Sequence, residues 1–118
     1  MNLDAKTLWL VLDTETTGED PTMNSVMELG WALCDWETTH LCGGSYIAPA
    51  HPCTPEARAA HQIWDEDVKG APQLHDVLQT QLAPQLREHV DKLAAYVAHN
   101  APFDSSFLPM LNKKPWLD

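Results

Sequence analysis

Two carboxylates stand one residue apart at the end of an apolar run. Residues 8–12 (LWLVL) are typical of a buried strand, and Asp13 and Glu15 follow directly. Because side chains at positions i and i+2 of a strand point to the same face, we expect the two carboxylates to lie together. Such like charges repel each other unless a cation lies between them, and hard oxygen ligands favour Mg²⁺ or Mn²⁺. In the alternative interpretation, both acids are solvated at the start of a loop.

A second segment supplies a third carboxylate. Residues 92–98 (KLAAYVA) predict another buried strand, and a helix begins after it. Asn100 is a good N-cap for this helix, a proline suits its first turn, and apolar residues recur every four positions. Asp104 would lie in the first turn. If the two strands are neighbours, Asp104 can face Asp13 and Glu15, so that three carboxylates converge on one or two metal ions.

These segments resemble the first two motifs of a known family. The sequences DTETTG at 13–18 and HNAPFD at 99–104 are similar to those of the DEDD superfamily of 3′→5′ exonucleases. Between them, VMELG at 26–30 resembles the family's second strand, and AHQI at 60–63 resembles its His-Gly-Ile segment. The resemblance covers nearly the whole chain, and the compact middle and the ending resemble the exodeoxyribonuclease X subgroup.

The resemblance implies a fold and an activity. The fold is α/β: an RNase H-like mixed sheet, with three antiparallel strands plus a parallel strand, flanking helices, and an incomplete C-terminus. Residues 1–118 would form the N-terminal part of a single exonuclease domain. The activity is metal-dependent 3′→5′ hydrolysis of single-stranded or frayed nucleic acid, DNA being favoured, to nucleoside 5′-monophosphates. The settings it implies are proofreading, DNA replication and DNA repair.

The resemblance also assigns roles to the three carboxylates. Asp13, Glu15 and Asp104 would be both the catalytic residues and the ligands of two Mg²⁺ or Mn²⁺ ions. Asp13 would bridge the ions, Glu15 would hold the ion that carries the nucleophilic water, and Asp104 would support the second ion. One ion would activate the water and the other would stabilise the leaving 3′-oxygen.

Four further residues are candidates for substrate binding. Thr16 and Thr17 could contact the terminal ribose through their backbone, or they could only form the turn. His61 could pack beside the terminal base, or it could be an exposed residue at a helix end; Gln62 replaces the family's usual glycine after it. Asn100 belongs to the second motif.

The family's third motif, a histidine followed five residues later by an aspartate, is absent from this sequence. These residues are the family's general base and a metal ligand, so we expect weak or no activity from this chain alone. A shortened reading frame or a small protein completed by a partner would explain the absence. A degenerate, non-catalytic exonuclease-like binding domain is the alternative function.

Composition limits the other functions. The 118 residues fit one domain, and the formal charge of −10, with seven Lys and Arg, weakens any expectation of tight binding to long nucleic acid. Three cysteines without a Cys-x-x-Cys pair indicate reduced thiols and a cytoplasmic protein. No apolar run suggests a membrane span. The expected partners are a single-stranded 3′ end and either a second copy of the chain or a polymerase or repair protein.

The remaining elements follow from apolar periodicity and turn residues. Strands at 8–12, 26–34 and 43–48 would form an antiparallel meander, and a strand at 94–98 would lie parallel to the first after a helical crossover. A turn is expected at 37–40. Thr54 and Pro55 are typical of a helix start. The expected helices lie at 54–61, 65–68, 72–82, 84–90 and 102–111.

Overall fold

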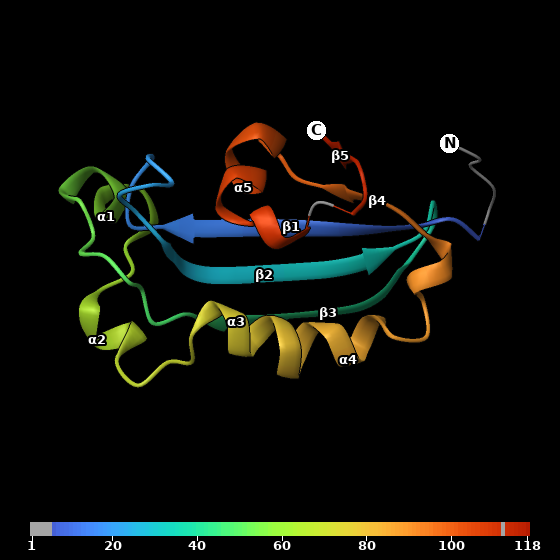
Figure 1. Ribbon diagram of the computed structural model, residues 1–118, viewed down its shortest axis with the longest axis horizontal. Coiled ribbons are helices and arrows are strands. Elements are labelled where there is room, and N and C mark those ends of the chain that lie inside the picture. The colour runs from blue at the N-terminus through green and yellow to red at the C-terminus, as the bar shows by residue number, and fades with distance from the viewer. Residues whose placement is uncertain (1–5, 112) are drawn as a thin grey trace.

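The computed structural model describes residues 6–111 and 113–118. Its centre is a five-stranded sheet of order β3-β2-β1-β4-β5 (Figure 1). The strands are β1 (Leu8–Thr16), β2 (Val26–Cys34), β3 (Thr39–Tyr46), β4 (Leu93–Val97) and β5 (Trp116–Leu117).

The sheet is mixed, as the sequence predicts. β1 pairs antiparallel with β2, which pairs antiparallel with β3, whereas β4 lies parallel to β1. The register places Asp13 opposite Gly30 and Glu15 opposite Glu28. The predicted bounds of two strands were wrong. β1 continues through both carboxylates to Thr16, and β3 begins at Thr39, inside the expected turn.

A fifth strand was missed in the sequence. β5 is two residues long, which is too short to show any periodicity, and it pairs parallel to β4. Tyr96 donates its backbone N–H to the Pro115 carbonyl at 2.9 Å, and Ala98 donates to Leu117 at 3.0 Å. The rings of Tyr96 and Trp116 pack with their centroids 5.2 Å apart. β5 therefore adds a parallel edge beside β4.

Two short helices follow β3, and both match the predicted positions. α1 (Pro55–His61) begins with Thr54 as N-cap, whose side chain accepts the Ala57 N–H at 3.1 Å. α2 (Asp65–Val68) follows. In the residues that the structure describes, no helix is long and apolar enough to cross a membrane.

The next helical segment differs from the two helices expected at 72–82 and 84–90. α3 (Leu74–Val77), a π-helical turn (Leu78–Leu82) and α4 (Ala83–Leu86) run on without a break in helical backbone angles. Pro84 has no N–H for the regular hydrogen-bond ladder, and the wider π turn lies directly before it. A single-turn 3-10 helix (Val90–Lys92) then leads into β4.

The last helix is shorter than expected. α5 (Ala101–Phe107) ends four residues before the predicted end at 111, and a 3-10 turn (Pro109–Leu111) follows. Pro109 cannot donate a backbone hydrogen bond to continue the α-helix.

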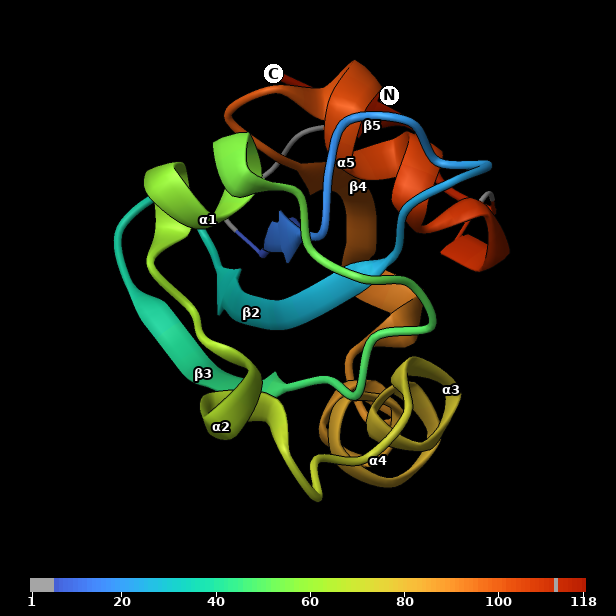
Figure 2. The same ribbon diagram turned by 90° about the vertical axis from the view of Figure 1, so that its left-hand side faces the viewer.

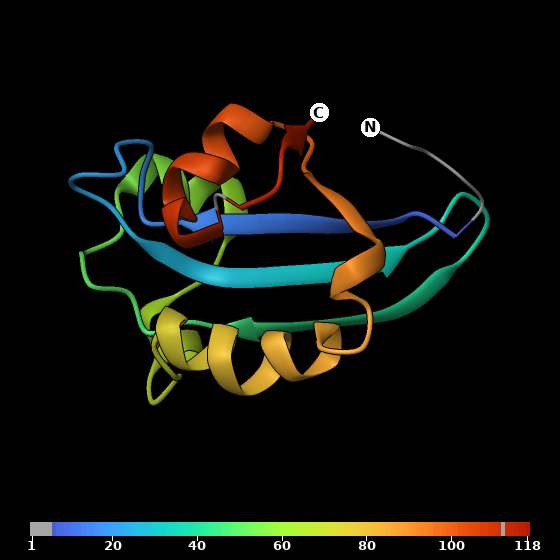
Figure 3. The same ribbon diagram turned by 45° about the vertical axis from the view of Figure 1, so that its right-hand side comes forward.

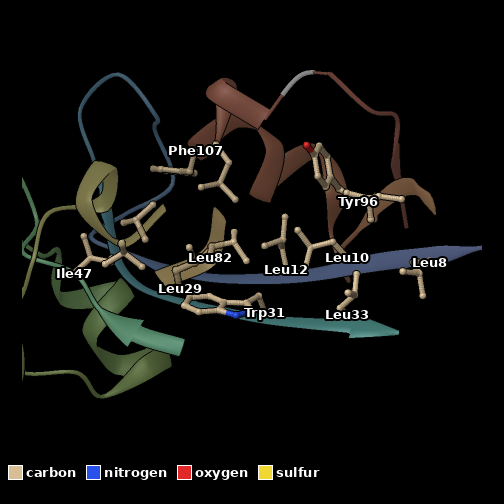
Figure 4. Close-up of a cluster of buried hydrophobic side chains, with 14 residues drawn as sticks. Leu8, Leu10, Leu12, Leu29, Trp31, Leu33, Ile47, Leu82, Tyr96 and Phe107 are labelled. Carbon is tan, nitrogen blue, oxygen red and sulfur yellow. The ribbon is translucent and has the colours of Figure 1, made fainter. Parts of the chain in front are cut away.

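The core lies on one face of the sheet. Figure 2 shows α5 and the α3–α4 segment on the same side, and Figure 1 and Figure 3 show α3–α4 running lengthwise beside β3. The side chains of Leu8, Leu10 and Leu12 belong to one buried cluster with Leu82 and Phe107, with Leu8 toward one end of it and Phe107 toward the other (Figure 4). Burying each such side chain stabilises the fold by about 1.5–3 kcal/mol. Alternation along β1 therefore places its odd-numbered residues on the opposite face.

Candidate active site

Asp13 and Glu15 share the face of β1 that is turned away from the core. Leu12, Thr14 and Thr16 between and beside them are buried, whereas Asp13 is exposed and Glu15 is half-buried. This alternation is the period of two that a strand imposes. The two carboxylates therefore lie side by side, as expected from their spacing.

Asp104 is connected to the same strand through Thr14. The Asp104 side chain is 5% exposed, and its Oδ1 accepts hydrogen bonds from Thr14 Oγ1 at 2.6 Å and from Thr14 N at 3.1 Å. The pairing of β4 with β1 stops at Val11, opposite Val97. The Thr14 N–H lies beyond the last pair of the parallel ladder, and the Asp104 side chain at the start of α5 accepts its hydrogen bond instead of a β4 carbonyl.

The carboxylates interact electrostatically. Partial burial raises the pKa of Asp13, and the negative charge of Asp104 raises it further, against an opposing effect of His99. Partial burial likewise raises the pKa of Glu15, followed by the charges of Asp13, Glu28 and Asp104, with His61 opposing them. The site is therefore one in which negative charge is crowded and a cation would be favoured.

The three carboxylates do not form a ready-made metal cage. Across residues 6–111 and 113–118, no group of three or more His, Cys, Asp or Glu side chains is arranged to hold a metal ion. Thr14 binds one oxygen of the Asp104 carboxylate, and the sharing of a metal ion by the three carboxylates stays a prediction. The donor set itself, hard carboxylate oxygens without sulfur, suits Mg²⁺ or Mn²⁺.

Thr16 and Thr17 hold the turn after β1. Thr16 Oγ1 donates to the Gly18 carbonyl at 2.6 Å, and Thr17 Oγ1 accepts the Ser25 N–H at 3.0 Å. The backbone N–H of Thr17 donates to Ser25, and its carbonyl accepts from Thr54. These bonds favour the turn-forming role for Thr17, while contact of either residue with a ribose stays a prediction.

His61 is fixed against the end of β1. Its Nδ1 accepts the Ile63 N–H at 3.0 Å, so its Nε2 carries the proton and donates to the Thr16 carbonyl at 2.9 Å. The bond to Thr16 spans 45 positions in the sequence. His61 thereby ties the C-terminal end of α1 to the strand that carries the carboxylates, a role that its residue type alone did not reveal.

Asn100 occupies the N-cap position of α5 but does not cap the helix with its side chain. Asp118 does so instead, because its Oδ1 accepts the Ala101 N–H at 2.6 Å. Asn100 is exposed, and its contact with substrate stays a prediction. The neighbouring His99, which was not among the predicted site residues, lies within electrostatic reach of Asp13.

A pocket of about 540 Å³ adjoins these residues. Its walls include Glu15 and Thr16 of β1, His61 of α1 and Phe103 of α5. Glu19, Asp20 and Glu56 also line it, and its lining contains no Lys or Arg. The pocket can therefore accept a ring-sized group beside the carboxylates, but it offers no basic side chain to a phosphate.

Comparisons with known proteins bear on the family. The sequence pattern of the RNase T family of exonucleases matches residues 10–114. The DNA polymerase III epsilon subunit of Pasteurella multocida (strain Pm70) is 32% identical over 113 residues, covering 89% of this chain and 42% of that protein. The epsilon subunit of Haemophilus influenzae (strain ATCC 51907 / DSM 11121 / KW20 / Rd) is 32% identical over 105 residues, covering 84% and 39%.

Solved structures share the fold. Exonuclease X in complex with 5′ overhanging duplex DNA superposes with a TM-score of 0.67 at 26% identity, covering 92% of this chain and 57% of that one. E. coli exonuclease I bound to an oligonucleotide gives a TM-score of 0.70 at 18% identity, covering 86% and 22%. The chain thus spans less than half the length of the epsilon subunits that it matches.

Proposed function

The chain belongs to the RNase T exonuclease family, within the DEDD superfamily of 3′→5′ exonucleases, and on that premise we propose that it forms the N-terminal part of one exonuclease domain. The proposed reaction is hydrolysis of the terminal phosphodiester at the 3′ end of single-stranded or frayed DNA. The product is a nucleoside 5′-monophosphate.

One observation carries this proposal. Asp13 and Glu15 stand on one face of β1 with raised pKa values, and the charge of Asp104 contributes to both shifts. Asp13, Glu15 and Asp104 would hold two Mg²⁺ or Mn²⁺ ions. When bound, such ions supply an activated water and charge stabilisation at the leaving oxygen.

The protein's own residues would orient the substrate. The Thr14 bonds fix the Asp104 carboxylate, and the His61 bond to the Thr16 carbonyl fixes the wall of the pocket beside Glu15. The pocket would receive the terminal nucleotide, with Phe103 as an apolar surface for its base or sugar. These contacts position the scissile bond beside the carboxylates.

DNA is the proposed substrate, and a replication or repair protein is the proposed partner. The epsilon subunits are components of DNA polymerase III by name, and the exonuclease X complex contains duplex DNA with a 5′ overhang. Cys34, Cys42 and Cys53 are free thiols, which supports a cytoplasmic setting.

Digestion of a 5′-labelled single-stranded oligonucleotide tests the proposal. With Mg²⁺ or Mn²⁺, and with protein in excess of the oligonucleotide, we expect a weak ladder that shortens from the 3′ end, because the third motif is absent. Chelation by EDTA and the Asp13→Ala variant should each abolish it, whereas Asp91→Ala, at an exposed carboxylate outside the site, should leave it unchanged.

Two results would count against hydrolysis at this site by this chain. A ladder that persists in Asp13→Ala would assign the hydrolysis to another site or to a contaminant. No digestion by a correctly folded sample even under these conditions would mean that this chain is inactive by itself, either as a part of an exonuclease or as the alternative, a non-catalytic exonuclease-like binding domain.

A further inference from the structure

A second groove lies on the other side of α1 from the active-site pocket. It has a volume of about 620 Å³ and is lined by Cys53, Pro55, Arg58, Ala59, Gln62 and Trp64. The active-site pocket is lined by other residues of the same helix, among them Ala57 and His61. A helix is about 10–12 Å across with its side chains, so the two hollows lie within a few nucleotides of each other.

The groove contains an exposed indole, that of Trp64, which does not cap the helix that it precedes. Trp64 is 52% exposed and occupies the N-cap position of α2 without making a side-chain cap hydrogen bond. Asp67 caps instead, through its Oδ2, which accepts the Trp64 N–H at 2.8 Å. Ser, Thr, Asp or Asn at this position would stabilise the helix. A large exposed aromatic side chain where capping favours a small polar one is typical of a functional site.

Arg58 is held over this indole. Its guanidinium carbon lies 5.2 Å from the ring centroid of Trp64. Nη2 donates to Asp65 Oδ1 at 2.5 Å, and Nε donates to the Ile63 carbonyl at 3.4 Å. These bonds orient the planar head group while using only part of its donor set. An oriented guanidinium loses less freedom when it binds a phosphate.

The charge distribution indicates which ligand fits. The active-site pocket has several acidic residues and no Lys or Arg in its lining, and the chain carries a formal charge of −10. A nucleic acid strand entering that pocket therefore needs an anchor outside it. Bases stack on aromatic side chains irrespective of sequence, and Arg supplies attraction to the backbone. The groove offers both side by side.

We propose that this groove binds one nucleotide of the single strand whose 3′ end enters the active site. Its base stacks on Trp64 and its phosphate meets Arg58. The inference rests on the proposed exonuclease function, and it assigns to the Arg58–Trp64 groove the holding of the strand upstream of the cleaved end.

NMR titration of the full chain tests the groove directly. The indole N–H signals of the five tryptophans are followed while a short oligothymidylate is added in EDTA, so that no hydrolysis occurs. We expect the Trp64 signal, assigned with Trp64→Phe, to shift. The Trp36 signal is the internal control, because Trp36 is 61% exposed and packs against Trp9 outside the groove. Tripolyphosphate in place of the oligonucleotide can meet Arg58 but cannot stack, so it should shift the Trp64 signal much less than the oligonucleotide does.

Two variants give the size of the effect. Trp64→Thr should weaken oligonucleotide binding about tenfold, as the loss of one stacked base does, without lowering the melting temperature, because Thr is a better N-cap. Trp36→Thr is the matched control and should bind as the unaltered chain does. Arg58→Gln should reduce the slope of log K against log salt by about 0.7, which corresponds to one lost phosphate contact.

The outcomes separate this inference from the proposed function. Hydrolysis from the 3′ end together with unchanged binding in Trp64→Thr would overturn the groove and leave the exonuclease intact. A Trp64 shift without any hydrolysis would support the groove and count against the exonuclease. If the oligonucleotide shifts no indole signal, or if tripolyphosphate reproduces the Trp64 shift, the groove does not bind a nucleobase.

Discussion

Gln62 has a left-handed backbone conformation, with φ 56° and ψ 32°, at the C-terminal end of α1. Among the described residues it is the sole non-glycine with positive φ. A non-glycine residue in the left-handed conformation destabilises the folded state by about 1–2 kcal/mol. Glycine removes this strain, but it also makes the unfolded chain more flexible, which lowers the free energy of unfolding by about 0.4–1 kcal/mol. Gln62→Gly should therefore raise the free energy of unfolding by about 0.5–1 kcal/mol.

Urea denaturation of Gln62→Gly and Gln62→Ala measures this difference. Alanine keeps the strained backbone, so Gln62→Ala should unfold like the unaltered chain. Equal stabilities for all three chains would show that the conformation carries no cost. The same strain explains in physical terms why glycine is usual at this position in the family that the sequence resembles.

Residue types predict part of the site, and geometry supplies the rest. The spacing of Asp13 and Glu15 correctly predicted that they share a face, since strand geometry fixes that relation. It did not predict Thr14 as the donor to Asp104, because the bond joins residues 90 positions apart. The bond from the Ala101 N–H to Asp118 was missed for the same reason. Asn100 does lie at the predicted N-cap position, but its side chain makes no cap hydrogen bond.

At the scale of elements, Thr14 joins β1 to α5. Thr14→Val keeps the shape of the side chain and removes the 2.6 Å hydrogen bond to the buried Asp104 carboxylate. A hydrogen bond to a charged group contributes about 1.5–3 kcal/mol, so the variant should lose about that much stability. Thr80→Val, which removes a bond to the Asp76 carbonyl on an exposed helix surface, is the matched control and should change stability by less than about 0.5 kcal/mol.

Chemical denaturation measures the free energy of unfolding of the two variants and of the unaltered chain. A loss in Thr14→Val no greater than that in Thr80→Val would mean that the bond to Asp104 does not hold α5 against the sheet.

The connection between β2 and β3 makes the stability of the protein dependent on pH. The Asp35 carboxylate accepts the N–H groups of Glu37 and Thr38 at 2.7 Å each and a bond from His40 Nε2 at 2.8 Å. These bonds, the two backbone ones foremost, hold the pKa of Asp35 well below its ordinary value of 3.8. Because the folded-state pKa is depressed, the stabilisation is present above the unfolded-state pKa and is lost as the pH falls toward the folded-state pKa.

Thermal melting of Asp35→Asn between neutral pH and about pH 2 tests this dependence. At neutral pH the melting temperature of the variant should be lower than that of the unaltered chain. The difference between the two melting temperatures should decrease once the pH falls below about 4. Asp91→Asn, at an exposed carboxylate of the turn before β4, should show no such narrowing. A gap that stays constant with pH would exclude the Asp35 carboxylate as its cause.

Elements were predicted best where local chemistry defines them. Thr54 and Pro55 fixed the start of α1, because capping and the proline ring act within a few residues. The start of β3 was wrong because the Asp35 turn begins and ends earlier than the polar residues suggested. The break expected at Pro84 did not occur: a π turn ends at Leu82, and Pro84 lies in the first turn of α4, where a proline is tolerated.

At the scale of the whole molecule, the described elements cover the two faces of the sheet unequally. The face packed by α3–α4 and α5 holds the main core. The opposite face bears Asp13 and Glu15, and beside them the partly exposed apolar residues Val11, Tyr46 and Leu117. Strand register places two of these residues in one row across the sheet: Val11 pairs with Val97, which pairs in turn with Leu117. The carboxylates therefore open to the side of the sheet that these helices leave free.

In the proposed function, Asp13 and Glu15 on this open face are ligands of divalent cations together with Asp104. Calorimetric titration of Mn²⁺ into the full chain, Asp13→Asn, Glu15→Gln and the control Asp91→Asn tests it most directly. We expect Mn²⁺ to bind the unaltered chain and Asp91→Asn alike, and removal of either site charge to weaken Mn²⁺ binding at least about tenfold, since each is a hard oxygen ligand of the ion. Equal Mn²⁺ affinity in Asp13→Asn and the unaltered chain would show that Asp13 is not a metal ligand.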